Sequence, residues 1–193
     1  MVRNSVQIDM TRFYVDSKYI GEKEVSITDA DDIHHYIKVL RAKKGDEAVV
    51  SDGVRYEYRC RIKEISKKEI VLEIIDKNEF HSEPAIKVTL YQGVPKGAKM
   101  DDCIRKCIEL GVYSIVPVMT DRVDVSDNKT GNMKNRLVRW RKISREAAKQ
   151  SQRGIVPEIR EFINNEELYE ELKDYDLVVW PYEQEKQTTI KER

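Results

Sequence analysis

Basic side chains recur at helical spacing near the middle of the chain. Residues 132–152 read as one long helix that ends before Gly154, with an apolar side that includes Trp140 and Ile143. The opposite side gathers five cations, Arg139, Lys142, Arg145, Lys149 and Arg153, with Glu146 alone among them. Like charges at neighbouring helical positions repel one another, and a solvated face usually mixes signs. The pattern therefore favours a polyanion partner such as RNA or DNA, and an ordinary solvated face is the alternative.

A second group of candidate residues lies in the loop 94–99. Lys96 and Lys99 flank Gly97 between an expected strand and an expected helix. Ligands of open α/β sheets collect at this end of the strands, and a helix start with nearby lysines suits a phosphate. A plain solvated connection fits the same residues. The sequence contains neither a GxGxxG motif nor a Walker loop, which argues against an NAD enzyme or a nucleotide hydrolase.

Other kinds of site find little support in the sequence. His34 and His35 are adjacent and so point in different directions on a helix, and Cys103 and Cys107 fall on an apolar helix face. The histidines and cysteines lack the spacing of metal ligands, and no serine or cysteine triad is suggested. We therefore predict no metal site.

The overall charge conceals a segregation along the chain. The 193 residues include 35 basic and 35 acidic side chains, so the net charge is 0. Residues 86–154 carry 15 basic and 7 acidic side chains, whereas residues 155–193 carry 5 and 11, so the middle block has a basic footprint. The chain contains only three cysteines, no apolar leader and no apolar run of about 18 residues. These features predict a cytoplasmic protein without a disulfide framework.

The elements that would position these residues fall into two groups. In the first eighty residues we expect strands at 12–15, 47–51, 55–65 and 70–75, a helix at 29–40 and a hairpin at Asp52-Gly53. After a polar break at 78–84, expected strands at 86–94, 113–119, 156–159 and 176–180 alternate with expected helices at 100–110, 132–152 and 164–173. The alternation predicts parallel strands with helical crossovers. The fold class is therefore α/β, with a small β-barrel followed by a parallel α/β domain that is cut short.

Several strings of the sequence resemble one known family. They are RFYV, HHYIKVLRAKKGD and the Asp-Gly hairpin in the first part, then LYQGVPKGAKMDDCIRKCIELGVYSIVPVMTDR and WRKISREAAKQSQRGIVPEI. Together they resemble the RsmE-type small-subunit ribosomal RNA (uracil-N3)-methyltransferases of the SPOUT superfamily. The resemblance implies a PUA-like RNA-binding β-barrel domain at 1–78 and the N-terminal part of a SPOUT methyltransferase domain at 86–193, cut short before the trefoil knot.

The resemblance also implies an activity and its partners. The expected reaction is S-adenosylmethionine (SAM)-dependent methylation of uridine N3 in small-subunit (16S) ribosomal RNA. The expected partners are that RNA or the assembled small subunit, and the intact protein would be a homodimer. We expect neither a membrane nor DNA as a partner.

The site residues follow from the aligned motifs and from the basic helix. Contacts to RNA are expected from Arg12, Arg41, Lys96, Lys99 and Arg145, and the helix adds Arg139, Lys142 and Lys149. The negative charge that develops on the uracil would be stabilised by Arg153 or Arg122, with Glu146, Glu183 or an ordered water as the base. Pro181, Tyr182 and Glu183 would form the first wall of the SAM pocket.

Two motifs of the family do not occur in this sequence, and they leave the activity open. A GPEGG-type loop and an LRxET-type segment are missing, so the SAM site is expected to be incomplete and the chain as given inactive. One alternative is an RNA-binding module without catalysis, which would bind RNA and give no heat with SAM. The other is an α/β enzyme that binds a phosphorylated metabolite near Lys96 and Lys99 and is indifferent to RNA.

Overall fold

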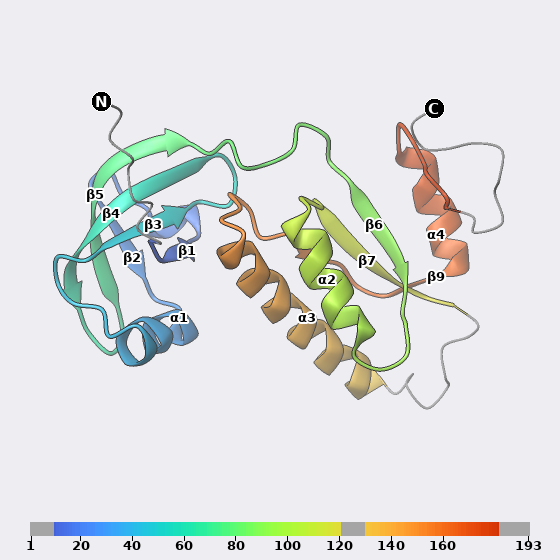
Figure 1. The fold of residues 1–193 in the computed structure, drawn as a ribbon, viewed down its shortest axis with the longest axis horizontal. Coiled ribbons are helices and arrows are strands. Elements are labelled where there is room, and N and C mark those ends of the chain that lie inside the picture. Colours follow the sequence, from blue (N-terminus) through green and yellow to red (C-terminus); the bar gives the residue numbers. More distant parts are fainter. Residues whose placement is uncertain (1–9, 121–129, 182–193) are drawn as a thin grey trace, which may run out of the picture.

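The computed structural model describes residues 10–120 and 130–181, which form two modules joined by one extended linker (Figure 1). We call residues 10–79 the N-terminal module, and residues 86–120 with 130–181 the C-terminal module. The N-terminal module holds a curled five-stranded sheet of order β1-β3-β4-β5-β2. The C-terminal module holds a parallel sheet of order β6-β7-β8, in which β9 also pairs with β7. The α/β fold class, with a PUA-like part and a SPOUT-type part, is confirmed.

The N-terminal module contains the predicted strands and helix and one further strand. Its elements are β1 (Arg12–Tyr14), η1 (Ser17–Tyr19), β2 (Glu24–Ile27), α1 (Ala30–His34), η2 (His35–Val39), β3 (Glu47–Ser51), β4 (Tyr56–Ile65) and β5 (Ile70–Glu79). Strand β2 was not predicted, and it forms one edge of the sheet by pairing antiparallel with β5. The predicted helix at 29–40 is α1 followed without a break by the π-helical turn η2.

The side chains of strand β4 alternate between core and solvent. Tyr58, Cys60 and Ile62 are buried in the core of the module. On the other face, Arg61 pairs with Glu47 of β3 at 2.9 Å, and Lys63 pairs with Glu24 of β2 at 2.5 Å. The row of cations on this strand is thus interleaved with carboxylates from neighbouring strands.

Local side-chain hydrogen bonds fix the start of α1 and the turn between β3 and β4. The Asp29 carboxylate accepts the backbone N–H of Asp32 at 2.9 Å and so caps α1. The Asp52 carboxylate accepts the backbone N–H groups of residues 54, 55 and 56, and Gly53 takes a positive φ of 70°. The predicted start of the helix near residue 29 and the predicted hairpin at Asp52-Gly53 are confirmed.

The C-terminal module is a parallel sheet with helices on both faces. Its elements are β6 (Thr89–Gly93), α2 (Lys99–Glu109), β7 (Ser114–Met119), α3 (Thr130–Gln150), β8 (Glu158–Ile159), β9 (Ile163–Asn164), α4 (Asn165–Glu171) and η4 (Leu172–Asp174). Helices α2 and α3 pack with Ile115 of β7 in one core cluster, and Leu168 of α4 packs with Val116 and Val118 in another. Figure 1 shows α2 and α3 side by side, with α4 beyond β6. In the described part of the chain, no helix combines the length and apolar character needed to cross a membrane.

The predicted strand at 176–180 is wrong. Residues 177–180 are exposed and pair with no strand in the described part of the chain. Trp180 stacks on Tyr169 of α4 with ring centroids 6.4 Å apart, and Tyr175 packs edge-on against Tyr91 of β6. An apolar run becomes a strand only when a sheet edge pairs with it, and here aromatic contacts hold the segment beside the sheet instead.

Candidate functional site

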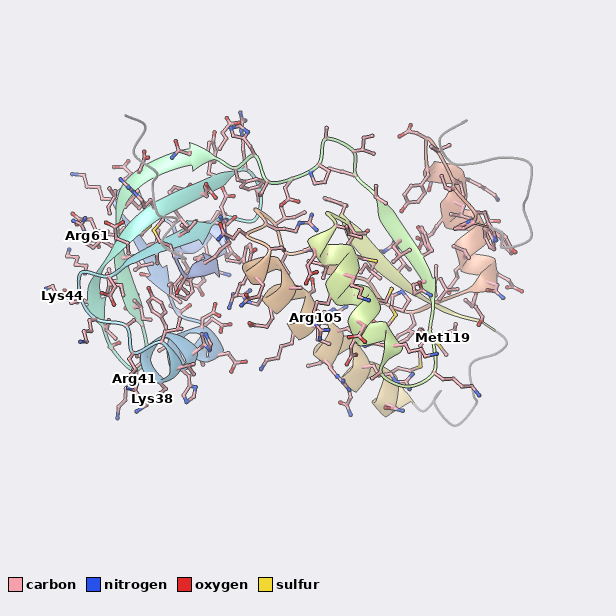
Figure 2. All side chains as sticks on the ribbon, viewed as in Figure 1. Lys38, Arg41, Lys44, Arg61, Arg105 and Met119 are labelled. Carbon is pink, nitrogen blue, oxygen red and sulfur yellow. The ribbon has the colours of Figure 1, made fainter. Side chains whose placement is uncertain are left out.

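The N-terminal module exposes a short segment whose cations have no acidic partner. Residues 38–44, which we call the basic segment, contain Lys38, Arg41, Lys43 and Lys44, and all four side chains are exposed. None of the four forms an ion pair with any described residue. Figure 2 shows Lys38, Arg41 and Lys44 along the lower and outer edge of the module. Val39 and Leu40, between two of the cations, are also exposed. Unpaired cations with adjacent apolar groups suit a nucleic acid strand.

The backbone of the basic segment is held in an uncommon conformation. Arg41 has a φ of 54°, in the left-handed region that side chains with a Cβ rarely adopt. The Ala42 N–H donates to the Tyr36 carbonyl at 3.1 Å, which ties the segment back to the turn η2. A strained residue that is exposed and carries a free charge is a candidate for function. Arg41 was predicted from the sequence, whereas Lys38, Lys43 and Lys44 were missed although the string KVLRAKK displays them.

The predicted cationic face of α3 lies against carboxylates from other parts of the chain. Arg145 and Lys149 both donate to the Asp32 carboxylate of α1, each at 2.7 Å, and the Asp32 side chain is only 5% exposed. Burial raises the pKa of Asp32, but the hydrogen bonds from Lys149 and Arg145 outweigh it and hold the pKa below its ordinary value. The carboxylate is therefore ionised and shared by the two cations.

Two further predicted residues of α3 are also paired, one with an exposed carboxylate and one with a buried carboxylate. Lys142 lies 3.5 Å from the Asp31 carboxylate, and both side chains are largely exposed. Arg139 forms an ion pair with Asp101 of α2, which also accepts the indole N–H of Trp140 at 3.1 Å. This second pairing joins α3 to α2 within the C-terminal module.

Arg153, which follows α3, is buried at the joint between the modules. Its side chain is 4% exposed and forms an ion pair with Glu83 of the linker. Its Nη1 donates to the Val112 carbonyl at 2.5 Å and to the Ile108 carbonyl at 3.1 Å. The hydrogen bonds from Arg153 outweigh the effect of burial and hold the pKa of Glu83 below its ordinary value. A guanidinium with this many internal partners supports the fold in the state described.

The premise that the α3 cations lack counter-charges was therefore wrong. A helical wheel shows only the charges on its own helix, and here the carboxylates come from α1, from α2 and from the linker. Assignment of these residues to RNA contact stays a prediction. Glu146 lies among them, 3.7 Å from Lys149 and beside the cavity between α1 and α3.

Arg12 has a buried setting that the sequence did not indicate. Its side chain is 8% exposed, and Nη2 donates to Glu57 of β4 at 2.8 Å. The second terminal nitrogen, Nη1, is buried without a hydrogen-bond partner among the described residues. The predicted contact of Arg12 with RNA stays a prediction.

The loop after β6 presents both predicted lysines to solvent. Lys96 and Lys99 are exposed, and Gly97 between them has a φ of 71°. The first turn of α2 carries Asp101 and Asp102, whose charges disfavour an anion bound directly at the helix start. The two lysines are better placed to contact phosphates as an exposed pair beside the sheet, and this too stays a prediction.

A cavity of about 540 Å³ lies beside β6, within the size range of small-molecule sites. Its walls are residues 89–93 of β6, residues of α4 and the segment 177–181. Tyr91 donates to the Glu171 carboxylate at 2.7 Å, and Arg160 donates to the same carboxylate at 2.6 Å. The ion pair with Arg160 lowers the pKa of Glu171, while burial and the hydrogen bond to Glu171 raise that of Tyr91.

The predicted cofactor residues divide between described and undescribed parts of the chain. Pro181 lines the cavity beside β6. Tyr182, Glu183 and the predicted catalytic residue Arg122 lie outside the described residues. Within residues 10–120 and 130–181, no three histidine, cysteine, aspartate or glutamate side chains gather as metal ligands.

Comparison with known proteins places both modules in one family. A family model described as an RNA methyltransferase PUA domain matches residues 27–75, and one described as an RNA methyltransferase domain matches residues 81–192. Ribosomal RNA small subunit methyltransferase E of Bacillus subtilis is 30% identical over 179 residues, which are 91% of this chain and 69% of the relative. The protein of the same name from Buchnera aphidicola is 35% identical over 132 residues, 68% of this chain and 52% of the relative.

A solved structure agrees with these matches. Ribosomal RNA small subunit methyltransferase E from Neisseria gonorrhoeae, bound to S-adenosyl methionine, superposes with a TM-score of 0.71 at 28% identity. The match covers 82% of this chain and 64% of that one. The chain thus spans roughly half to two thirds of the length of these proteins. Because the RNA methyltransferase model matches more than half of its residues, this chain belongs to the RNA methyltransferase family that includes ribosomal RNA small subunit methyltransferase E.

Proposed function

We propose that the chain carries the RNA-binding part and some of the catalytic part of a SAM-dependent methyltransferase that modifies uridine N3 in small-subunit ribosomal RNA. The substrate is the RNA or the assembled small subunit, and the intact enzyme works as a homodimer in the cytoplasm. The proposed boundary between the two domains lies in the linker, between residues 78 and 86.

The observation that carries this proposal is the basic segment. It offers four exposed cations without acidic partners, on a module that matches the PUA domain of RNA methyltransferases. Phosphates can bind such cations without first breaking an ion pair, so no internal interaction has to be given up when RNA binds. Lys96 and Lys99 add two exposed cations on the C-terminal module, in the loop that follows β6.

The cavity beside β6 fits the cofactor. Leu90, Leu168 and Val179 offer apolar walls for an adenosine, and Gln92 and Thr120 offer polar groups at its edge. SAM supplies an electrophilic methyl group on a sulfonium. The walls of this cavity would exclude water, and Pro181 would bound the pocket as the first residue of its predicted wall.

The cation that stabilises the developing charge on the uracil stays a prediction for both arginines. Arg153 reaches Glu83 and two carbonyls and is almost fully buried, so contact with a base would require these bonds to break. We therefore favour Arg122 for this role. Arg122 follows β7, which ends at Met119, by three residues in the sequence, and ligands of parallel sheets gather beyond the carboxyl ends of their strands.

Filter binding with a transcript of small-subunit ribosomal RNA tests the proposal. We expect binding that weakens steeply with salt, and a lower slope of log K against log salt when Lys38, Arg41 and Lys44 are replaced by alanine. Salt-independent or absent RNA binding would refute it. Calorimetry with SAM then separates the catalytic proposal from its rival, because an RNA-binding module without catalysis gives RNA binding and no heat.

A further inference from the structure

The two modules touch at two places that lie at different distances from the linker. Near the linker, the Tyr14 hydroxyl donates to the Arg153 carbonyl at 2.7 Å and the Ser51 hydroxyl donates to the Gly154 carbonyl at 2.5 Å. A Cβ at Gly154 would overlap the Phe80 ring, so the backbone there packs directly on the end of β5. We call this region the joint.

The second region is the pair of ion pairs between Asp32 and α3, which we call the latch. Arg145 and Lys149 lie one turn apart near the end of α3, and Arg153 follows the helix after Gln152, whose φ is 54°. We call these three cations the stripe. The latch therefore occupies the last two turns of α3, within roughly 8 Å of the end of the helix along its axis. In Figure 1 the linker crosses at the top of the molecule, and α1 lies at the bottom of the N-terminal module.

Charge, and not apolar packing, connects α1 to α3. The buried apolar residues of α1 and η2, Ile33 and Tyr36, belong to the core of the N-terminal module. Between the two helices lies a cavity of about 640 Å³, lined by charged residues from both modules. Tyr14, at the joint, is the N-terminal residue that packs in the C-terminal core cluster. Among the described residues, the modules are thus packed at the joint, whereas α1 and α3 are bridged by the ion pairs of the latch and by the exposed pair Lys142–Asp31.

This arrangement has a mechanical consequence. A linker and a joint close to each other constrain translation, but they leave the angle between two rigid bodies free to vary about a hinge. A second attachment away from the hinge removes that freedom. Arg145 also donates to the Tyr14 carbonyl at 3.1 Å, so one side chain connects latch and joint.

We propose that Asp32 is a positioning residue that fixes the angle of the N-terminal module against α3 and thereby sets where the basic segment meets the RNA. The part that concerns RNA rests on the proposed function. An RNA long enough to reach both modules gains affinity only when it fits both at once. An RNA that binds the basic segment alone gains nothing from the latch.

Residual dipolar couplings of backbone amides test the latch in the full chain without RNA. In the wild-type protein the couplings of both modules should fit one alignment tensor. In Asp32→Asn they should require two tensors, because Arg145 and Lys149 no longer share a counter-charge. Asp31→Asn is the matched control: it removes the same charge one residue away, from an exposed side chain, and should keep one tensor.

A second variant guards against simple loss of folding. In Asp32→Leu/Lys149→Met both members of the more buried pair of the latch are replaced by apolar side chains, and Arg145, whose side chain is 33% exposed, keeps access to solvent. Two tensors are expected here as well. One common tensor in both variants would overturn the proposal.

Binding measurements then test the consequence for RNA. We expect Asp32→Asn to weaken binding of a small-subunit ribosomal RNA fragment roughly tenfold while leaving binding of a six-nucleotide RNA unchanged. Equal weakening for both RNAs would indicate damage to the module itself, and unchanged binding of both would refute the positioning role. If the wild-type protein binds neither RNA, the proposed function fails. The dipolar couplings, which are measured without RNA, still show whether Asp32 fixes the angle between the modules.

Discussion

The basic segment and the stripe of cations at the C-terminal end of α3 are both rich in lysine and arginine, but they differ in whether these side chains have carboxylate partners. The segment carries Lys38, Arg41, Lys43 and Lys44, none of them ion-paired within the described residues. The stripe carries Arg145, Lys149 and Arg153, each held by a carboxylate from the N-terminal module or the linker. The first set has its charge available for a partner, and the second has it engaged inside the molecule.

This difference shows that a count of like charges on one element does not identify a binding surface. Charges that look uncompensated on a helix can be neutralised by residues more than one hundred positions away, as Arg145 and Asp32 are. The relevant quantity is the number of exposed cations that remain without a partner after folding. On that measure the N-terminal module, and not α3, presents the basic surface.

The largest expected effect is the loss of stability when Arg153, the most buried member of the stripe, is replaced. Arg153→Met should lower the free energy of unfolding by about 3 kcal/mol, because it leaves Glu83 without its counter-ion and two carbonyls without donors. Urea denaturation measures this. Lys38→Met is the control and should change stability by less than about 0.5 kcal/mol. Similar destabilisation in both variants would remove the distinction between the two regions.

The second largest expected effect is a loss of RNA affinity when cations of the basic segment are removed. Lys38→Ala/Arg41→Ala/Lys44→Ala should weaken binding of the ribosomal RNA transcript about 100-fold at low salt, because each cation removed deprives one phosphate of a hydrogen bond that is worth about 1 kcal/mol. The matched control is Lys18→Ala/Arg55→Ala/Lys173→Ala, which removes three exposed cations that pair with Asp16, Glu79 and Glu170. Equal weakening in the two triple variants would mean that only net charge matters.

At low pH the stripe should lose its ionised carboxylate partners, so that its cations become unpaired like those of the basic segment. The pKa values of Asp32 and Glu83 are lowered in the folded protein, so their ionised forms stabilise it above the ordinary carboxyl range, about pH 4. That contribution is lost as the pH falls through the lowered values, where the stripe becomes unpaired like the basic segment. Urea denaturation between pH 6 and pH 3 should show falling stability, with a shallower fall in Asp32→Asn. The same slope in both proteins would contradict this.

The fold was largely predictable because its signals are local. The strand at 55–65, the helix that begins near residue 29 and the turn at Asp52 each depend on residues close in sequence, and the structure contains all three. Strand β2 and the segment 176–180 depend on which sheet edge is available, and that is decided by distant residues. For this reason β2 was missed, and the strand at 176–180 was predicted wrongly.

The candidate site was less predictable for the same reason. The charge of Arg145 is evident in the sequence, but its partner Asp32 looked like an ordinary first-turn acid of a capped helix. Arg41 was placed in the site through the resemblance, and the neighbouring lysines in KVLRAKK were the signal that could have extended it. Cations such as Arg145, which the sequence suggests as RNA contacts, pair with carboxylates of the other module and support the fold. These partners are known only from the folded structure.

The smallest expected effect isolates charge from backbone strain at Arg41. Arg41→Gly removes the cation, and glycine adopts the observed φ of 54° without a Cβ penalty. The relief of strain opposes the larger conformational entropy of glycine in the unfolded chain, so stability should change by less than about 0.5 kcal/mol. RNA affinity should nevertheless fall roughly fivefold, as expected when a single phosphate is deprived of its hydrogen bond. Arg41→Lys keeps the charge and should restore most of the affinity at unchanged backbone strain. If Arg41→Gly binds RNA as tightly as the wild-type protein, the left-handed backbone serves the turn alone, and the exposed charge of Arg41 no longer supports a role for the basic segment in RNA binding.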